Sequence, residues 1–207
     1  MVHCTLIIDV SGANSTFSRQ VAGIPLDPGR HCAGVRAYYG GVSGLDEQGY
    51  IELLFLKELL PGCLWIFPLA DGRANVGLGL RSDVVGKRRT DLKKLLQQML
   101  AAHPLLRHRI AHAKPEGPVQ GMGLPLASKR WPQSGEGYLL AGDAAHLIDP
   151  FTGEGISHAM ISGMHAADVA AEAVKCSRTH GAFLKRHDAL VWKRLGKEQA
   201  ISSRLQQ

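Results

Sequence analysis

The sequence predicts an α+β fold, and three features of the chain lead to that prediction. Apolar strand-like runs separated by turn residues fill positions 30–80, as in an antiparallel sheet. A helical periodicity of leucines follows over 87–102. The two ends of the chain instead combine a short apolar strand with helices. Elements segregated in this way favour an antiparallel middle bracketed by two αβ-like ends.

The first half of the chain is expected to be rich in strands. Residues 3–9, "HCTLIID", are predicted to form a buried strand, followed by a turn and a short helix that ends near Ala22. Four strand runs come next: "HCAGVRAYYGG", "GYIELLFL", "CLWIFPLA" and "RANVGLGL". Asp71-Gly72 lies between the last two runs and is a strong hairpin signal.

The second half is expected to be mainly helical. The helix predicted over 87–102 is amphipathic, because its apolar residues recur at helical spacing: Leu92, Leu95, Leu96, Met99 and Leu100. The polar segment 110–126 is expected to return to the sheet. A strand over 137–142, a helix from about Gly153 to Lys175, and one or two helices within 179–207 complete the prediction.

Composition is that of an ordinary globular protein, with 207 residues, of which 45% are hydrophobic and 20% charged. No apolar run approaches the roughly 20 residues that a membrane span needs. The first residues, "MVHCTLIID", lack the basic region and cleavage site of a signal peptide. The four cysteines are scattered without a CxxC pair, which favours reduced thiols in a cytoplasmic protein over disulfides or a zinc site.

The net charge is +6, and the excess lies in two basic groups. The first comprises Lys87, Arg88, Arg89, Lys93 and Lys94, and the second comprises Lys185, Arg186, Lys193, Arg194 and Lys197. Solvated helix faces explain such groups, and attraction to an anionic membrane surface or a phosphorylated substrate is the alternative. No signature of a nucleic-acid-binding module accompanies them, so we expect no nucleic-acid partner.

The strongest candidate site lies in "LLAGDAAHLIDPFTGEGISHAM", Leu139–Met160. Asp143 stands where a buried strand ends, and the preceding Gly142 lets the backbone approach a ligand closely. The carboxylate there can accept hydrogen bonds from neighbouring hydroxyls, as a sugar or ribitol presents them.

The same stretch continues into a helix start. Thr152, Gly153, Glu154 and Gly155 lead into the helix, whose first N–H groups are unpaired and suit an anionic or electron-rich group. A ligand with a polyol at one point and a charge-accumulating ring at another fits both features, and reduced flavin is such a ligand. The structural alternative is a glycine-rich turn capped by Asp143 and Thr152.

The motif "GDAAHLIDPFTGEGISHAM" closely resembles the second flavin-binding motif of the FAD-dependent oxidoreductases with the para-hydroxybenzoate hydroxylase fold. In that group the Gly-Asp carboxylate holds the ribitol, and the following loop and helix start face the isoalloxazine. The resemblance therefore implies FAD as the cofactor. It implies these cofactor-binding residues: Gly142, Asp143, Pro150, Thr152, Gly153, Glu154, Gly155 and Ile156.

Within that group, "PFTGEGI" and "PGCLWIFPLADGRANVGLGL" look most like the geranylgeranyl reductase branch. That branch carries a Tyr-x-Trp-x-Phe-Pro element on its substrate-domain sheet. Trp65, Phe67 and Pro68 match the element, whereas Cys63 stands where tyrosine is usual. The resemblance implies that the three matching residues bind substrate, although core packing would by itself account for one face of this strand.

"GANSTFSR" near the start is similar to the family's middle motif, Asp-Gly-Ala-x-Ser-x-x-Arg. Gly12, Ala13, Ser15 and Arg19 fit, and Ser11 replaces the aspartate. Gly12 and Arg19 are therefore further implied cofactor-binding residues. The three motifs occur in the family's order and spacing, and the resemblance covers nearly the whole chain.

Two features depart from the family pattern. His146 gives "GDAAH", which is more typical of aromatic monooxygenases, and it is either a proton donor near the flavin or a polar residue at a helix start. The strand–Gly-x-Gly-x-x-Gly–helix unit that cradles the FAD pyrophosphate is also missing. The chain therefore resembles the latter half of such a flavoprotein, without the N-terminal βαβ unit of its Rossmann-like subdomain, which a separate chain could carry.

The motif order implies a division into three parts. Residues 1–25 and 127–175 are expected to form a partial FAD-binding subdomain, 30–126 an antiparallel substrate-binding domain, and 176–207 the C-terminal helices. The implied activity is reduction of carbon–carbon double bonds in a geranylgeranyl or other isoprenoid chain, a reaction of lipid metabolism. A flavin-dependent aromatic or quinone monooxygenase and a catalytically silent partner subunit are the alternatives.

Other sites are weaker candidates. His108 and His112 are one helical turn apart, as zinc ligands can be, but without an HExxH pattern we expect surface histidines and no metal. Ser128, Ser134 and Ser157 lack a nucleophile elbow, which argues against hydrolysis. The catalytic residues and the electron donor, NADPH or ferredoxin, are not assigned by the sequence.

Overall fold

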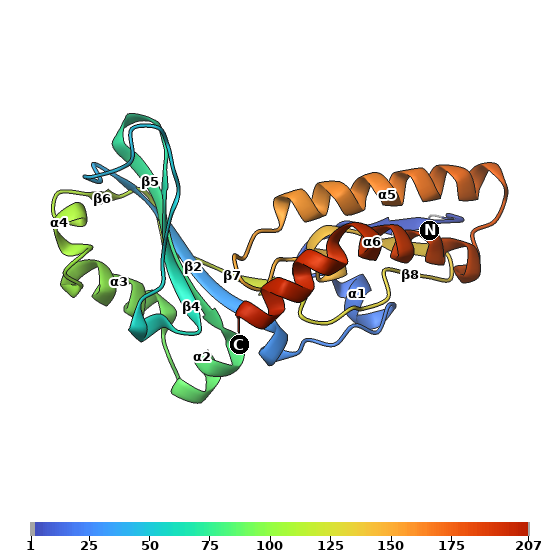
Figure 1. Cartoon of the computed structure of the whole chain (residues 1–207), viewed down its shortest axis with the longest axis horizontal. Coiled ribbons are helices and arrows are strands. Elements are labelled where there is room, and N and C mark those ends of the chain that lie inside the picture. Colours follow the sequence, from blue (N-terminus) through green and yellow to red (C-terminus); the bar gives the residue numbers. More distant parts are fainter. Residues whose placement is uncertain (1–2, 207) are drawn as a thin grey trace. The chain divides into compact units, whose positions relative to one another are not determined.

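The computed structural model describes residues 3–206, which form two compact units (Figure 1). The described residues up to His31 and from Leu124 onward form one unit, here called the terminal unit. Cys32–Gly123 form the other, called the central unit. Helices and sheets occur in both, so the predicted α+β class is confirmed.

The central unit is built on a sheet with the strand order β3-β4-β5-β2-β6, in which β7 also pairs with β2. Its strands are β2 (His31–Gly40), β3 (Glu52–Leu54), β4 (Gly62–Pro68), β5 (Arg73–Arg81), β6 (Lys114–Pro115) and β7 (Gln120–Pro125). The strands from β2 to β6 pair antiparallel. Asp71 and Gly72 have positive φ at the β4–β5 hairpin, as the Asp-Gly pair predicted.

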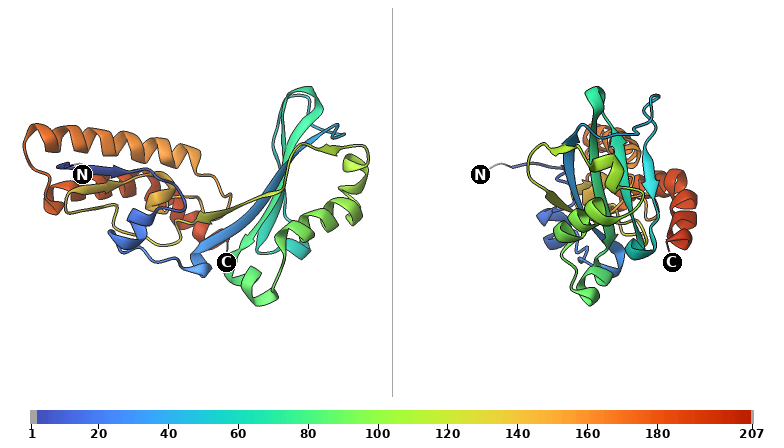
Figure 2. Two further views of the ribbon diagram at one scale, coloured as in Figure 1. Left: turned by 180° about the vertical axis from the view of Figure 1, so that it is seen from behind. Right: turned by 90° about the vertical axis from the view of Figure 1, so that its left-hand side faces the viewer.

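One face of this sheet carries the core of the central unit. Leu64, Ile66 and Val76 are fully buried there, in one cluster with Leu96 and Leu100 of α3. The helices are α2 (Ser82–Arg88), α3 (Leu92–Ala102) and α4 (Arg107–Ile110), with short 3₁₀ turns η2 (Lys57–Leu59) and η3 (Ala70–Gly72). Figure 2 shows α3 and α4 on the same side of the sheet.

The prediction of a single helix over 87–102 is wrong at its start, because this region contains the end of α2 and the separate helix α3. Asp91 caps α3, because its side chain accepts hydrogen bonds from the N–H groups of Lys93 (3.0 Å) and Lys94 (3.1 Å). Arg89 ends α2 in the left-handed conformation, with a φ of 50°. The amphipathic face predicted for this region is confirmed, since Leu96, Met99 and Leu100 of α3 are buried.

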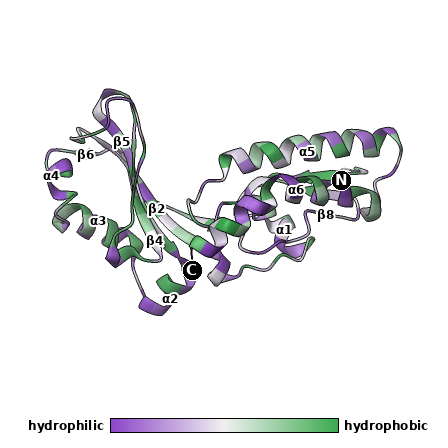
Figure 3. Ribbon diagram, viewed as in Figure 1, coloured by the Kyte–Doolittle hydropathy of each residue, from purple (hydrophilic) through white to green (hydrophobic). Residues whose placement is uncertain are grey.

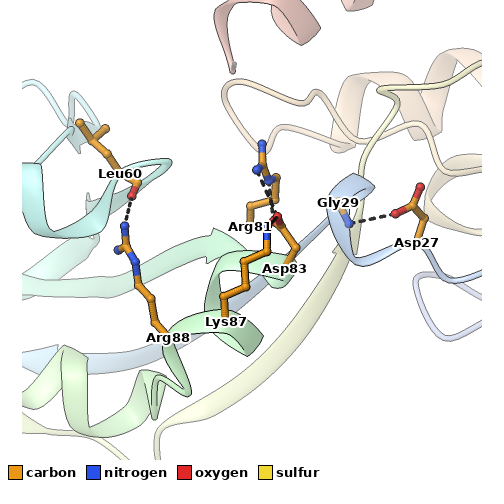
Figure 4. A network of polar contacts seen from close by, with 7 residues as sticks. All are labelled: Asp27, Gly29, Leu60, Arg81, Asp83, Lys87 and Arg88. Carbon is orange, nitrogen blue, oxygen red and sulfur yellow. Dashed lines mark hydrogen bonds and ion pairs between the residues drawn. The ribbon is translucent and has the colours of Figure 1, made fainter.

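The first basic group begins in α2, where the side chains of Lys87 and Arg88 make hydrogen bonds within the central unit (Figure 4). The carboxylate of Asp83 accepts hydrogen bonds from Arg81 Nε (2.6 Å) and Lys87 Nζ (3.3 Å). The bond from Arg81 is the main cause that lowers the pKa of Asp83 to about 2. Arg88 donates to the carbonyl of Leu60 (3.2 Å). In the terminal unit, a separate contact in Figure 4 joins Asp27 to the N–H of Gly29 (2.9 Å).

The terminal unit has a small sheet with the order β1-β9-β8: β1 (Ile7–Asp9), β8 (Ser134–Gly135) and β9 (Tyr138–Leu140). β1 and β9 are parallel. The helical elements are α1 (Thr16–Gln20), η1 (Pro28–Arg30), η4 (Gly142–Ala145), α5 (Ile156–Lys175) and α6 (Gly181–Leu205). α5 and α6 lie side by side, and Leu139 is buried between residues of both, including Ala166 and Leu184 (Figure 1).

No helix within residues 3–206 is long and apolar enough to cross a membrane. In the same described part of the chain, no group of three His, Cys, Asp or Glu residues could hold a metal ion.

Leu96→Ala is expected to lower the free energy of unfolding by about 2–5 kcal/mol, because Leu96 is fully buried and its removal leaves a cavity. The matched change Leu105→Ala, at an exposed leucine of the same unit, should cost less than about 0.5 kcal/mol. Equilibrium urea unfolding followed by circular dichroism measures both. Equal losses for the two variants would contradict the position of this core.

Candidate functional site

The parallel pairing of β1 with β9 brings two turns of the terminal unit to the same edge of its sheet. Asp9 ends β1 and lies opposite Leu140, which ends β9. Because parallel strands point in one direction, the turns that follow them emerge together. These turns and nearby residues line one small pocket: Gly12, Ala13, Ser15, Ser18, Arg19, Leu26, His31, Pro125, Asp143, Ala144 and His146. The motif that contains Gly12 and the motif that contains Asp143, both of which resemble flavoprotein motifs, therefore border the same pocket.

The turn after β1 is organised by Asp9, which is buried. Its carboxylate accepts hydrogen bonds from the N–H (3.0 Å) and hydroxyl (2.6 Å) of Ser11 and from the hydroxyl of Ser15 (2.5 Å). Ser15 in turn caps α1 by accepting from the N–H of Ser18 (2.8 Å). Sequence reasoning missed this role of Asp9. The available signal was an acidic residue at a strand end followed by serines.

Asp143 follows β9 and has no such partners. Within the described residues its carboxylate makes no hydrogen bond or ion pair, and its burial raises its pKa above the ordinary value. Gly155, at the start of α5, lies beside it: a Cβ atom at Gly155 would lie 3.3 Å from Asp143 Oδ1. A half-buried carboxylate without protein partners can accept hydrogen bonds from the hydroxyls of a ligand.

Gly142 fixes how the turn approaches α5. Its φ of 60° is left-handed, and a Cβ atom there would lie 3.1 Å from the Cβ of Ala159. Its N–H donates to the hydroxyl of Ser162 (3.0 Å), which is buried inside α5. Gly142 therefore permits close packing of the turn on the helix, and its predicted approach to a ligand stays a prediction.

His146 borders the same pocket in the left-handed conformation, with a φ of 56°. Burial, followed by the nearby charges of His31 and Arg19, lowers the pKa of His146 to about 4. The imidazole is therefore neutral at physiological pH, with one nitrogen that donates and one that accepts. His31 was not among the residues predicted for the site, because nothing near it in the sequence marks it.

The loop before α5 is organised by Asp149, which is buried. Its Oδ1 atom accepts hydrogen bonds from the N–H groups of Phe151 (3.0 Å) and Thr152 (2.8 Å) and from the hydroxyl of Thr152 (3.0 Å). Glu154 accepts from the N–H (2.7 Å) and hydroxyl (2.8 Å) of Ser157. The side chains of Thr152 and Glu154 thus hold the loop, and their cofactor contacts remain predictions.

α5 begins at Ile156, so the helix start predicted at about Gly153 is wrong by one turn. Gly153 has a φ of 74° and lies in the loop with the buried Pro150. Gly155 is the N-cap residue and supplies no side-chain cap. The first backbone N–H groups of a helix carry partial positive charge, which suits an electron-rich group.

In the central unit, Trp65 and Phe67 lie on the sheet face opposite the core, and both are half-buried. Their rings stack with centroids 6.1 Å apart, and Trp65 Nε1 donates to the side chain of Asn75 (3.1 Å). The indole covers Gly77, where a Cβ atom would lie 2.3 Å from its ring. Pro68 ends β4, and strand alternation sets it on the side of Leu64 and Ile66. The core on the other face belongs to Leu64 and Ile66, so this face offers an apolar aromatic surface.

Comparison with known proteins gives curated relatives, although no family model matches the chain. Digeranylgeranylglycerophospholipid reductase 2 of Methanopyrus kandleri is 34% identical over 188 residues, which are 90% of this chain and 46% of the relative. Digeranylgeranylglycerophospholipid reductase of Thermoplasma acidophilum is 33% identical over 194 residues, 93% of this chain and 47% of the relative. The chain spans about half the length of the curated relatives it matches.

Solved structures agree with these relatives. A geranylgeranyl bacteriochlorophyll reductase-like protein from Thermoplasma acidophilum matches with a TM-score of 0.85 and 26% identity, over 98% of this chain and 49% of that one. A flavin-dependent brominase shares the fold, with a TM-score of 0.71 and 23% identity over 94% of this chain and 48% of its own. The chain therefore matches about half the length of each of these reductases in sequence, and about half of the reductase-like protein in fold.

Proposed function

We propose that the chain is the ribitol- and ring-binding half of an FAD-dependent reductase that saturates double bonds of geranylgeranyl chains. This proposal rests mainly on Asp143, which follows β9 and lies beside the start of α5. Its carboxylate is half-buried and has no partner among the described residues. The substrate class is supported by the relatives named digeranylgeranylglycerophospholipid reductase. Such a reductase acts on membrane lipid, which agrees with an apolar substrate.

A bound flavin supplies the hydride for reduction of a carbon–carbon double bond. Asp143 accepts hydrogen bonds from the ribitol hydroxyls, and Gly12 and Arg19 border the same pocket from the turn after β1. The N–H of Ser157 donates to Glu154, and the other first N–H groups of α5 would face the ring, whose reduced form is electron-rich. Pro150, Gly153 and Gly155 set the course of the loop that leads to them.

His146 acts in this proposal as a neutral imidazole. It borders the pocket next to Asp143, and its lowered pKa keeps it uncharged at neutral pH. A neutral imidazole can donate a hydrogen bond to a ligand or pass a proton, whereas it adds no fixed positive charge. Arg19 supplies the fixed positive charge at this pocket.

The substrate chain lies, in this proposal, on the aromatic face of the central sheet. Trp65 and Phe67 offer stacked rings, and Gly77 leaves room for the indole to lie close to the sheet. Apolar surfaces of this kind bind apolar ligands through burial of area, at roughly 25 cal/mol per Å². Pro68 closes this strand.

We further propose a cytoplasmic protein that contacts membranes peripherally to reach a lipid substrate. Lys185, Arg186, Lys193, Arg194 and Lys197 of α6 are all exposed, which supports attraction to anionic headgroups. Arg186 is partly neutralised by Glu172, whose carboxylate lies 2.6 Å away. The contact is therefore expected to be weak and to fade as salt is raised.

The isolated chain is expected to purify colourless and to bind FAD no tighter than high micromolar. Two or three charge-assisted hydrogen bonds contribute roughly 1.5–3 kcal/mol each, against a cost of association of at least about 4 kcal/mol. Joining the chain to the unmatched portion of the Methanopyrus kandleri relative should restore a yellow protein. Flavin absorbance and calorimetry measure both states. If the isolated chain bound one FAD tightly, the proposal that most of the binding free energy comes from the missing half would be wrong.

In the joined protein, Asp143→Ala is expected to weaken FAD binding roughly tenfold or more, since each such hydrogen bond is worth about 1.5–3 kcal/mol. Asp168→Ala, at an exposed aspartate of α5, is the matched control and should leave binding within about twofold. Equal affinities of the two variants for FAD would overturn the assignment of Asp143.

The joined protein, reduced chemically, is expected to add the mass of two hydrogen atoms per double bond to a digeranylgeranyl lipid, as mass spectrometry would detect. Trp65→Leu should lower kcat/KM about tenfold, mainly by raising KM, because it removes apolar contact area. Tyr50→Leu, at an exposed aromatic residue of the same unit, is the control. Flavin binding without any reduction of the lipid would favour the monooxygenase or the catalytically silent alternative.

His146 is expected to titrate in the isolated chain with a midpoint near 4, as followed by nuclear magnetic resonance of its ring protons. Because this pKa is below the unfolded value of about 6.5, the folded chain binds fewer protons between the two values. The free energy of unfolding should therefore rise with pH across that window, and His146→Gln should reduce the slope. A midpoint near 6.5 would show that the site does not desolvate this ring.

A further inference from the structure

The aromatic face of the central sheet has a cationic end. In the strand order β4-β5-β2, Trp65 pairs with Gly77, and Gly77 pairs with Arg36. Leu53 of β3 pairs with Trp65 on the other side. Because directly paired residues of antiparallel strands share a face, one row crosses the sheet from leucine through tryptophan and glycine to arginine. The ribbon of β4 is mainly hydrophobic, whereas β2 carries hydrophilic residues (Figure 3).

Arg36 lies next to the indole of Trp65. A Cβ atom at Gly34, which precedes Arg36 by two residues on the same face, would lie 3.6 Å from Cη2 of Trp65. The indole thus crosses the glycines of β5 and reaches β2. The interstrand spacing puts the Cα atoms of Leu53 and Arg36 about 14 Å apart. A ligand whose charged group binds Arg36 can therefore lay an apolar chain across the rings.

The guanidinium of Arg36 is free to bind an anion. It is half-buried and stacks on the ring of Tyr38, with its central carbon 4.6 Å from the ring centroid. Stacking uses the flat face of the guanidinium and leaves the N–H donors at its edge. Among residues 3–206, Arg36 makes no hydrogen bond or ion pair, whereas Arg73 on the same face is paired with Glu116 at 2.8 Å. A half-buried cation without a counter-ion favours an anionic ligand.

We infer that Arg36 binds the phosphate of an amphiphilic isoprenoid substrate whose apolar chain lies over Trp65 and Leu53. A guanidinium can form two parallel N–H···O bonds with one phosphate, which fixes the position of the charged end. The inference rests on the proposed function and deepens it, because it adds recognition of a headgroup to the site for the apolar chain. Arg36 would then select phosphorylated lipids over uncharged isoprenoids.

Other ligands use only part of this face. Inorganic phosphate would contact Arg36 and leave the rings in water, and an uncharged isoprenoid would cover the rings and leave Arg36 unpaired. A flat anionic membrane is attracted by clusters of exposed cations, whereas Arg36 is half-buried on the sheet. An anionic amphiphile satisfies the cationic and the apolar part in one molecule.

The test measures binding of two probes to the 207-residue chain, geranylgeranyl phosphate and geranylgeraniol, which differ only in the phosphate. Equilibrium dialysis, at concentrations below those at which the probes form micelles, gives both Kd values. The wild-type chain should bind the phosphate roughly tenfold or more tightly than the alcohol, because charge-assisted hydrogen bonds are added. Inorganic phosphate at the same concentration as the probes should displace neither of them.

Four variants separate the charged end from the chain site. Arg36→Gln should reduce the preference for the phosphate to about twofold or less and leave the affinity for geranylgeraniol within about twofold. Arg36→Lys keeps the charge without the fork of donors and should retain part of the preference, which excludes unfolding as the cause. Trp65→Leu should weaken both probes by a similar factor. Arg73→Gln, at the arginine already paired with Glu116, is the matched control and should keep the wild-type preference.

The possible failures distinguish the inference from the proposed function. Equal affinity of the wild-type chain for both probes would remove the role of Arg36 and leave the chain site on Trp65 standing. A preference that survives Arg36→Gln, or that Arg73→Gln abolishes equally, would assign the phosphate to another cation. Displacement of geranylgeranyl phosphate by inorganic phosphate would make Arg36 a site for the free ion. If neither probe bound, or if Trp65→Leu changed neither affinity, the proposed chain site would be wrong together with the inference.

Discussion

β1 and β9 lie far apart in the sequence but pair in parallel, with Ile7 opposite Tyr138 and Asp9 opposite Leu140. This short ladder decides where the candidate site is, because the turns that carry Gly12 and Asp143 both leave the sheet at its carboxyl edge. Only three residue pairs form the ladder, so its stability rests on the apolar layer around it. Leu139 and Leu140, both fully buried, supply that layer through α5 and α6. A core residue remote from the pocket can therefore determine whether the pocket exists.

The sequence predicted the elements whose signals are local. Alternation along "CLWIFP" separated Leu64 and Ile66 from Trp65 and Phe67, and the pleat of β4 keeps that separation. Which face would be covered could not be predicted, because α3 decides it from a distant segment. The predicted start of α5 is one turn early because the side chain of Asp149 binds the N–H of Thr152 and that of Glu154 binds the N–H of Ser157, which organises a loop up to Ile156. The importance of Asp9 was hidden for a related reason, since its partners are recognisable only once the turn is formed.

The glycines of the central sheet illustrate how one pattern can serve two purposes. Gly77-Leu78-Gly79 has the spacing with which a nucleotide-binding fingerprint begins, yet it lies inside β5. Its glycines face the same side as Trp65, where Gly79 pairs with Gly34 of β2. The three glycines leave a strip without side chains, and the indole of Trp65 contacts it. Here the glycines serve the packing of an aromatic ring and not the approach of a phosphate.

Three aspartates lie at or near the ends of elements in the terminal unit, and they differ in the hydrogen bonds that their carboxylates accept. Asp9 and Asp149 are the more deeply buried, and each accepts three hydrogen bonds from the turn that it organises. Asp143 is less buried, has no partner, and has a raised pKa. Burial of a carboxylate costs free energy unless hydrogen bonds compensate it. The protein compensates the first two within the fold and leaves the third open at a pocket, where water or a ligand can supply the donors. Residue type and position at a strand end are alike for Asp9 and Asp143, and only the hydrogen-bond inventory of the folded chain distinguishes them.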